Sequence, residues 1–257
     1  MKSYAVINAG LEKTAVQEFS EKYSITATSF VNLITFDATE QQLVTIANTS
    51  QSIRKLCLFI GNSLEEFPNF DLANYWEGNT FKVEVEYVKG QDNRLALSRK
   101  LLEHLNPLLP NPTIDLKKPD FYINITKSED KHYVGIDLCG VDLNSRHYRV
   151  FPHSASFKGD AAYHIVRSSK FTKGNKLLIG FAKDGALPIE AAIYATNSAT
   201  NLRTVFSYEK FKSLKDLKPL LEPKFESNIF AFDEGSQNFQ AARKNSNLAQ
   251  VPVTIHK

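Results

Sequence analysis

Apolar and polar positions follow two different periods along the first sixty residues. Strand-like apolar runs at 4–9, 30–36 and 53–60 are separated by two segments, 11–22 and 38–47, in which apolar residues recur at helical spacing. This β-α-β-α-β order predicts a small α+β unit of the ferredoxin-like type.

A period-two pattern marks a second unit. At 80–88 apolar side chains alternate with charged ones, as in a half-buried strand. Asp92 is placed to cap the helix that follows. Two apolar runs, 121–125 and 132–138, are joined by a short polar stretch, which predicts a hairpin. We therefore expect a second α+β unit over residues 76–142.

The last third of the chain has the alternating strand and helix pattern of an α/β sheet. A short apolar strand at 176–181 runs into a helix that begins near Pro188, and a second strand at 228–232 runs into a helix at 237–248. The run 251–256 has the pattern of a third strand. This order predicts the opening of a parallel sheet.

Between these two strand–helix pairs lies a long connection, residues 197–227, in which we expect a helix at 212–221. The chain has 42% hydrophobic and 23% charged residues, which is ordinary for a globular protein and argues against disorder or coiled coil. No apolar run approaches the roughly 18 residues of a membrane-spanning helix. Cys57 and Cys139 stand in separate apolar segments and are expected to be buried free thiols, consistent with a cytoplasmic protein.

Positive charge is concentrated in one stretch. Residues 144–176 hold seven basic side chains against one acidic one, although the whole chain has a net charge of only +3. Such a stretch fits the footprint of a phosphate backbone. A solvated face or an interdomain linker explains it equally well.

Six short motifs, in order along the chain, carry a family resemblance. PDFYINI at 119–125, YVGIDLCG at 133–140 and LNSRHYRV at 143–150 are similar to the end of the THUMP domain in RNA guanine methyltransferases of the archaeal tRNA and bacterial 23S rRNA types. There, a PD strand, an IDLSG strand and an L-x-x-R-G-Y-R segment come in this order. The other three motifs resemble the cofactor region of the same enzymes: LPIEAA at 187–192, IFAFD at 229–233 and AARKN at 241–245.

The resemblance implies a fold class and a domain order. The N-terminal half is expected to be α+β, a ferredoxin-like domain followed by THUMP, and the rest α/β, a partial Rossmann-like methyltransferase sheet. The implied boundaries are 1–65 for the ferredoxin-like domain, 66–143 for THUMP, 144–176 for a basic linker and 177–257 for an incomplete methyltransferase domain.

S-adenosylmethionine is the cofactor that the resemblance implies, with Gly185, Glu190 and Asp233 as its contacts. Asp233 could instead cap the helix that follows it, and Glu190 could be a favourable charge in the first turn of its helix. Aligned on the same motif, Ile179 replaces the leading acid, Lys183 replaces the first glycine of the loop and Asp184 replaces its serine. A lysine crowds a turn that needs close approach and places positive charge near the sulfonium. We therefore expect the cofactor to bind weakly or not at all.

RNA is the implied partner, and tRNA the implied type. Arginine presents a planar fork of donors that suits phosphate. Either Arg146 or Arg149 could instead pair with Asp137 or Asp142. Tyr133, Tyr148 and Phe151 could stack on bases or pack in a core. The residues expected to contact RNA are Arg146, Arg149, Lys158 and Arg167, with Lys170 and Lys173 as weaker candidates.

Whether the chain is an enzyme is left open, and no catalytic residue is assigned. The resembled enzymes carry an Asn/Asp-Pro-Pro-Tyr motif, which this sequence lacks. We expect a truncated, split or decayed methyltransferase, whose sheet is completed by a partner polypeptide or a second copy. The alternatives are an RNA guanine N2-methyltransferase completed by its partner and a structural subunit that binds acidic protein. His147, His153 and His164 lack the usual spacing of metal ligands, so no metal site is expected.

Overall fold

The computed structural model describes residues 1–69, 71–76, 78–106, 108–109, 111–221 and 226–257. The chain divides into two compact units. The limits of these units differ from the predicted boundaries at 65, 143 and 176. The first unit contains Met1–Val44, Lys55–Val141 and Val205–Lys218, and the second contains Thr45–Arg54, Asp142–Thr204 and Pro219–Lys257.

A mixed sheet is the frame of the first unit, and its eight described strands follow the order β2-β3-β1-β4-β8-β7-β5-β6. Neighbours are antiparallel from β2 to β7, whereas β5 pairs in parallel with both β7 and β6. The predicted hairpin of β7 and β8 is confirmed. The strands are β1 (Lys2–Val6), β2 (Thr28–Phe30), β3 (Leu33–Asp37), β4 (Lys55–Gly61), β5 (Thr80–Glu86), β6 (Thr113–Ile114), β7 (Phe121–Ser128) and β8 (Lys131–Asp137).

Four α-helices and two short 3-10 helices accompany these strands in the described structure. They are α1 (Glu12–Tyr23), α2 (Glu40–Thr49), η1 (Leu64–Asn69), α3 (Leu72–Tyr75), α4 (Gln91–Leu105) and η2 (Ser207–Lys210). Helix α4 is buried only near its C-terminal end, at Leu101 and Leu105. Its N-terminal half stands open, with Leu95 46% exposed. This open half forms one wall of a pocket described in the next subsection.

One predicted strand is in fact a hairpin. The hydrophobic pattern predicts one continuous strand at 30–36, but β2 ends at Phe30 and β3 begins at Leu33. Asn32 in the turn has a φ of 65°, a conformation that Asn adopts more readily than most residues. The apolar side chains on both sides of the turn conceal it in the hydrophobic pattern.

Two further expectations are wrong. Asp92 does not cap α4, because the helix already begins at Gln91 and its N-cap is Gly90; Asp92 lies in the first turn, where its charge favours the helix. The expected helix at 212–221 is absent from the described structure: residues 212–216 form turns and 217–221 have no regular structure. Pro219 lacks the backbone N–H that a helix interior needs.

The second unit is built on three parallel strands in the order β11-β10-β9, so the predicted β-α-β-α-β sequence of the last third is confirmed. Helix α5 lies in the segment predicted to be a linker, which corrects that interpretation. Ala162, Tyr163 and Val166 recur at helical spacing within the basic stretch and form the buried side of α5. The elements are α5 (Gly159–Ser168), β9 (Leu177–Gly180), α6 (Ala186–Thr196), β10 (Ile229–Phe232), α7 (Ser236–Ala249) and β11 (Thr254–His256).

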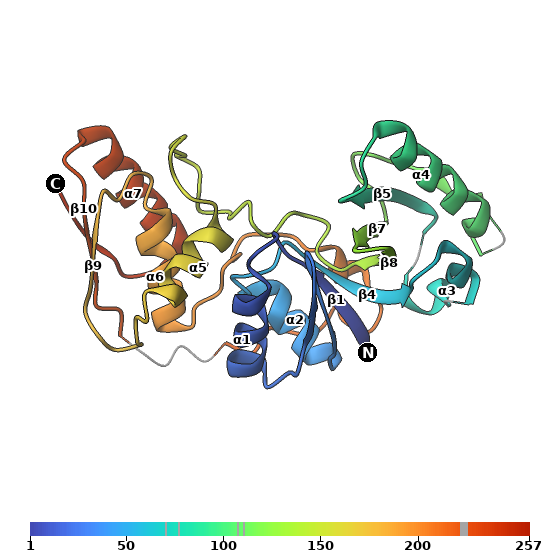
Figure 1. Cartoon of the computed structure of the whole chain (residues 1–257), viewed down its shortest axis with the longest axis horizontal. Helices are drawn as coiled ribbons and strands as arrows, with labels where there is room; N and C mark the ends of the chain where they lie inside the picture. Colours follow the sequence, from blue (N-terminus) through green and yellow to red (C-terminus); the bar gives the residue numbers. More distant parts are fainter. Residues whose placement is uncertain (70, 77, 107, 110, 222–225) are drawn as a thin grey trace. The chain divides into compact units, whose positions relative to one another are not determined.

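Helices cover one face of this small sheet. In Figure 1, α5, α6 and α7 lie on the same side of β9 and β10. Ile179 and Ala231 are buried on that side, in one core cluster with residues of α6 and α7. Alternate residues of the same strands point to the other face, where Leu178 is 68% and Phe232 42% exposed. The second face of the sheet is therefore apolar and open among the described residues.

Charged groups are sparse but paired inside the first unit. The ammonium of Lys55 lies 2.9 Å from a carboxylate oxygen of Asp137 and also contacts Glu84, and both Lys55 and Asp137 are almost wholly buried. Cys57 and Cys139 are buried free thiols, as predicted, and burial raises the pKa of both. In the described part of the chain, no helix is both long and apolar enough to cross a membrane.

Candidate cofactor loop, cationic residues and pocket

Two of the residues predicted to hold a cofactor, Gly185 and Asp233, lie in the loops that follow β9 and β10. Because these strands are parallel, the loops that follow them lie at the same edge of the sheet. The backbone N–H of Lys183, in the loop after β9, donates to Asp233 Oδ2 at 2.9 Å. Asp233 Oδ1 accepts from the Gly235 N–H at 2.9 Å and from the Asn238 amide at 3.1 Å. Asp233 therefore links the two loops.

The surroundings of Asp233 favour its charged form. Burial by itself raises the pKa of the carboxyl, but the N–H groups of Lys183 and Gly235 outweigh burial and lower the pKa below its usual value. The alternative that Asp233 caps α7 is wrong, because the N-cap is Gly235, two residues later. Asp233 thus stands at the strand end as an acceptor, which is the position predicted for a ribose contact.

The loop after β9 has an unusual backbone. Phe181, Lys183 and Gly185 have φ values of 56°, 51° and 85°. Only glycine adopts such angles without strain, and a residue with a Cβ costs roughly 1–2 kcal/mol there. Lys183 therefore takes the conformation natural to the glycine that it replaces. A Cβ on Gly185 would lie 3.0 Å from the Cα of Ala242, so Gly185 lets α6 and α7 pack closely.

Asp184 organises the loop, a role that the sequence did not reveal. Its side chain is wholly buried and forms an ion pair with Arg149, whose Nη2 lies at 2.9 Å. It also accepts from the backbone N–H groups of His153 (3.2 Å) and Ala186 (3.1 Å) and from the hydroxyl of Ser156. The only available signal was an acid at the serine position of the loop motif. The contacts of Asp184 therefore hold residues 149–156 against the loop after β9, which is the candidate cofactor loop.

Glu190 is not placed to contact a cofactor. Its side chain is fully buried, and Oε1 lies 2.7 Å from Nε of Arg146 and accepts from the Tyr148 hydroxyl at 2.7 Å. Oε2 accepts from the Gln51 amide at 2.8 Å. The prediction of a cofactor contact is corrected for this reason: Glu190 is enclosed by protein donors. The alternative of a first-turn charge is also insufficient, because the carboxylate is a core ion-pair partner.

The same geometry corrects the predicted RNA contact of Arg146. Its guanidinium is 0% exposed, so a phosphate cannot reach it. Burial by itself lowers the pKa of Arg146, but the charge of Glu190 outweighs burial and raises it, so the group stays charged. Neither of the alternative partners, Asp137 and Asp142, is the one observed. The sequence could not reveal this pair because its members are far apart along the chain.

The other predicted RNA contacts differ in exposure. Lys158 and Lys170 are exposed, whereas the side chain of Arg149 is only 17% exposed because of its pair with Asp184. Arg167 and Lys173 both lie over the ring of Tyr194, at 5.1 and 4.8 Å from its centroid. This places two cations around one aromatic ring.

The aromatic candidates divide in the same way. Tyr148 is fully buried and Tyr133 is 6% exposed, so both are core residues and the stacking interpretation is wrong for them. Phe151 is 40% exposed, with the Lys244 ammonium 4.7 Å from its ring centroid. Among the described residues, no three or more His, Cys, Asp or Glu side chains gather as metal ligands.

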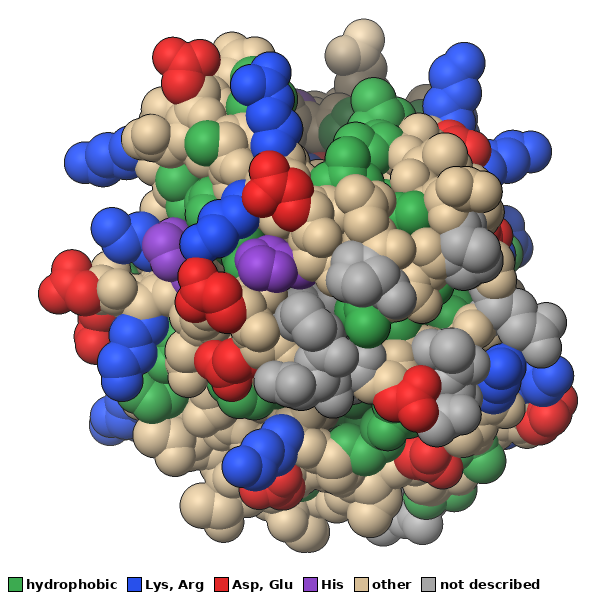
Figure 2. All heavy atoms as spheres, turned by 90° about the vertical axis from the view of Figure 1, so that its right-hand side faces the viewer, with side chains coloured by type: hydrophobic (Ala, Val, Ile, Leu, Met, Phe, Trp, Pro, Cys, Tyr) green, Lys and Arg blue, Asp and Glu red, His purple; other side chains and the backbone are tan. Residues whose placement is uncertain are grey.

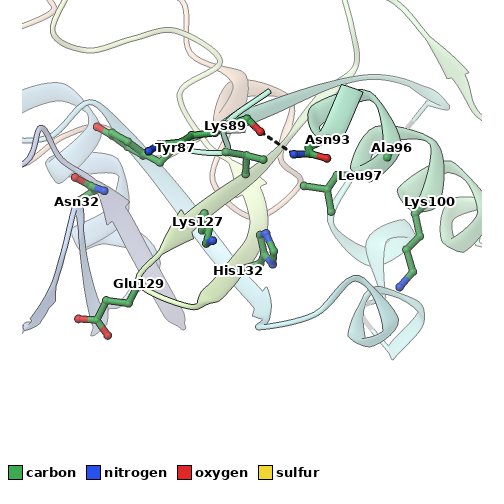
Figure 3. Close-up of a pocket in the computed structure, with 11 residues that line it drawn as sticks. Asn32, Tyr87, Lys89, Asn93, Ala96, Leu97, Lys100, Lys127, Glu129 and His132 are labelled. Atoms are coloured by element: carbon green, nitrogen blue, oxygen red, sulfur yellow. Dashed lines mark hydrogen bonds between the residues drawn. The ribbon is translucent and has the colours of Figure 1, made fainter. Parts of the chain in front are cut away.

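A pocket of about 810 Å³ opens in the first unit, and no sequence signal pointed to it. Its residues come from the β2–β3 turn, the end of β5, the open half of α4 and the β7–β8 hairpin (Figure 3). Burial, reinforced by the charge of Lys127, lowers the pKa of His132 in this pocket. The lining residues are Asn32, Tyr87, Val88, Lys89, Asn93, Ala96, Leu97, Lys100, Lys127, Glu129 and His132.

The molecular surface in Figure 2 shows no broad field of one sign. Lys and Arg side chains are intermingled with Asp and Glu on the face drawn there. A polyanion binding on such a face depends on local groups of cations rather than on a large potential.

Methyltransferases are among the known proteins that are similar to this chain. Residues 146–257 match the family described as UPF0020, RMKL-like, methyltransferase domain. The ribosomal RNA large subunit methyltransferase K/L of Vibrio campbellii is 29% identical over 162 residues, which cover 57% of this chain and 23% of that protein. The protein of the same name from Aliivibrio salmonicida is 26% identical over 221 residues, or 77% of this chain and 30% of its own length. The chain thus spans less than a third of these relatives and is related to RNA methyltransferases.

Solved structures show the same fold. A predicted N6-adenine-specific DNA methylase from Listeria monocytogenes superposes with a TM-score of 0.75 at 17% identity, covering 100% of this chain and 74% of that one. A methyltransferase-type protein complexed with SAH superposes with a TM-score of 0.73 at 20% identity, covering 99% and 74%. The mixed α/β architecture with its large sheet is therefore the fold of methyltransferase-like proteins.

Proposed function

We propose that this protein binds RNA, and that its methyltransferase-type loop holds S-adenosylmethionine weakly or not at all. The observation that carries the cofactor part is the bond from the Lys183 N–H to Asp233. A carboxylate has about four acceptor positions. Three protein donors already occupy three of these positions on Asp233. Little capacity is left for the two hydroxyls of a ribose.

Charge in the loop adds to this effect. The Lys183 side chain stands where the resembled enzymes have a glycine, and its ammonium reaches the Ala155 carbonyl oxygen at 3.4 Å. Two positive charges 4 Å apart repel by about 1 kcal/mol in water, and by several times more near a protein surface. A sulfonium bound beside this loop meets that repulsion.

Three observations support RNA as the partner. The relatives in sequence are ribosomal RNA methyltransferases. Exposed cations remain in the basic stretch, Lys158 and Lys170 among them. The order β1-α1-β2-β3-α2-β4, with β4, β1, β3 and β2 adjacent in the sheet, supports the ferredoxin-like interpretation of the N-terminus, and with it a THUMP-type RNA-binding half. The resemblance favours tRNA as the first RNA to test.

One observation favours the enzyme alternative. In the described structure β9 has a strand neighbour on one side only, and the apolar Leu178 and Phe232 are exposed on the open face. A partner polypeptide that adds a strand beside β9 and covers this face would turn the chain into part of an RNA guanine N2-methyltransferase. Native co-purification tests this alternative: a second polypeptide that confers methyl transfer to RNA supports it, and isolation of the chain alone counts against it.

Titration calorimetry with S-adenosylmethionine tests the cofactor proposal. The wild-type chain is expected to show weak or undetectable binding. Lys183→Gly removes the charge and the strained backbone together, so it is expected to bind more tightly, whereas Lys176→Gly, outside the loop, is the control. A wild-type Kd of about 1 μM or tighter, equivalent to roughly −8 kcal/mol, contradicts the proposal.

A further inference from the structure

We propose that the pocket beside the open half of α4 binds one unstacked nucleotide of a single-stranded RNA segment. This inference rests on the RNA-binding function proposed above and assigns it a site in the first unit. The pocket is distinct from the cofactor loop and from the basic stretch, because all of its residues lie between 32 and 132.

The pocket has the size and the support of a ligand site. Its volume of about 810 Å³ falls within the range of roughly 300–1,000 Å³ usual for small-molecule sites. Lys127 and His132 belong to neighbouring strands of one hairpin, which are hydrogen-bonded to each other at this register. The floor is thus part of the large sheet, and α4 forms a wall beside it (Figure 3).

An aromatic platform stands at one side. The Tyr87 ring lines the pocket, and its hydroxyl donates to the Ile7 carbonyl oxygen at 3.0 Å, which fixes the ring. Tyr87 also has a φ of 58°, a strained conformation that costs on the order of 1–3 kcal/mol and is frequent at ligand sites. Val88 and Leu97 supply apolar surface beside it. A fixed ring with apolar neighbours is the surface on which a base stacks.

Three lysines line the same pocket as Tyr87. Lys89, Lys100 and Lys127 line the pocket against a single acid, Glu129. Lys100 lies 2.7 Å from the exposed Glu65, a contact that a phosphate can displace because exposed ion pairs are worth little. Cations around an aromatic platform are the combination that holds a phosphate and its base together.

Polar groups that suit a base edge complete the lining. His132 has a lowered pKa and is therefore neutral near pH 7, so its ring offers one donor and one acceptor. Asn93 donates its side-chain amide to the Lys89 carbonyl oxygen at 2.9 Å, which fixes the orientation of the amide (Figure 3). A pocket for a bare phosphate needs neither the ring nor these neutral groups, so a nucleotide fits the lining better.

Blocking the pocket tests the inference. Ala96 lines the pocket from the exposed side of α4, so Ala96→Trp fills the space without disturbing the core. Leu95→Trp places the same side chain on the preceding residue, which does not line the pocket. Fluorescence anisotropy with a labelled single-stranded RNA is expected to show about tenfold or greater loss of affinity for Ala96→Trp, since one stacked base is worth about that much, and little change for Leu95→Trp.

A charge pair gives a second, independent readout. Lys127→Ala removes a lining cation, and Lys131→Ala removes an exposed one from the same hairpin. The slope of log affinity against log salt is expected to fall by about 0.7 for Lys127→Ala, the value for one phosphate contact to a single strand. Equal slopes for the two variants overturn a phosphate contact in the pocket.

Adenosine 5′-monophosphate, titrated against the same variants, separates the two sources of a nucleotide. If wild type binds RNA and both tryptophan variants bind it equally well, the pocket inference is overturned and the proposed function stands. If wild type binds no RNA, the proposed function fails. Mononucleotide binding that only Ala96→Trp abolishes then supports a free-nucleotide site and overturns the RNA source, whereas no mononucleotide binding overturns the pocket.

Discussion

Arg146 and Glu190 form an ion pair in which neither side chain is exposed, with 2.7 Å between Nε and Oε1. Arg146 also donates to the backbone carbonyl oxygens of Leu143 and Gln51, each at 2.6 Å. A buried pair persists only when further hydrogen bonds offset the loss of hydration, and this one has them on both partners. The arginine of the L-x-x-R-x-Y-R segment is therefore a structural residue of the second unit.

We expect Arg146→Ala to lower the free energy of unfolding by about 3–5 kcal/mol, because the Glu190 carboxylate is left buried without its cation. RNA affinity of the folded variant is expected to stay unchanged, since the guanidinium is 0% exposed. Urea unfolding and RNA binding below the melting temperature measure the two effects. Ser145→Ala, at an exposed neighbour, is the control. A loss of RNA affinity with unchanged stability would show that Arg146 reaches the RNA after all.

In the first unit, Lys55 forms the corresponding buried ion pairs, with Asp137 and Glu84. Burial by itself raises the pKa of Glu84, but the charge of Lys55 outweighs burial and lowers it. A depressed pKa contributes stability that is present above the unfolded-state value of about 4.3 and is lost as the pH falls through the folded-state value. We therefore expect the free energy of unfolding of the wild type to decrease when the pH is lowered below about 4.

Lys55→Met leaves the buried Asp137 without its cation and Glu84 with Lys82 as its remaining ion-pair partner, so we expect a loss of about 3–5 kcal/mol at pH 7. The difference between wild type and variant is expected to shrink as the pH falls and Glu84 becomes neutral. Urea unfolding at pH 7 and pH 3.5 measures it. A difference that is independent of pH would mean that the loss comes from packing rather than from charge.

The exposed lysines of the basic stretch are expected to bind RNA as diffuse charge. Replacing Lys158 and Lys170 together by alanine removes two exposed cations and should weaken RNA binding several-fold at low salt. The matched control replaces Lys2 and Lys13, which are also exposed. Equal losses in the two double variants, measured by filter binding, would assign the effect to net charge alone.

Arg149 is expected to behave differently from those lysines. Its guanidinium holds the buried Asp184 at 2.9 Å and is only 17% exposed. Arg149→Ala should therefore lower the melting temperature, while its effect on RNA affinity should be smaller than that of the Lys158 and Lys170 replacement. Thermal unfolding followed by RNA titration distinguishes the two effects. A large loss of RNA affinity at an unchanged melting temperature would restore Arg149 as a phosphate contact.

The hydrophobic pattern predicted most of the strands and helices because each depends on residues close together in sequence. It missed the Asn32 turn, hidden within apolar residues, and α5, where charge stood out more than spacing. Long-range partners could not be predicted in this way. The link from Lys183 to Asp233 joins loops fifty residues apart, and the first-unit pocket collects four separate segments.

The family motif shows the same limit residue by residue. It located Asp233 directly after β10 and Gly185 in the loop after β9, and parallel strands present such loops on one edge. It could not show that Glu190 faces a buried arginine, or that the acid in the serine position of the loop organises residues 149–156. Motif identity thus located the loop, and only the three-dimensional contacts showed which of its acids are enclosed by protein.

RNA binding by the chain as a function of salt is the measurement that tests the central claim most directly. With a few phosphate contacts, the affinity for a tRNA-sized RNA in filter binding is expected to fall about tenfold or more between roughly 50 and 200 mM salt. Absence of RNA binding at the lower salt concentration, with the chain shown to be folded by its thermal unfolding transition, would contradict the account.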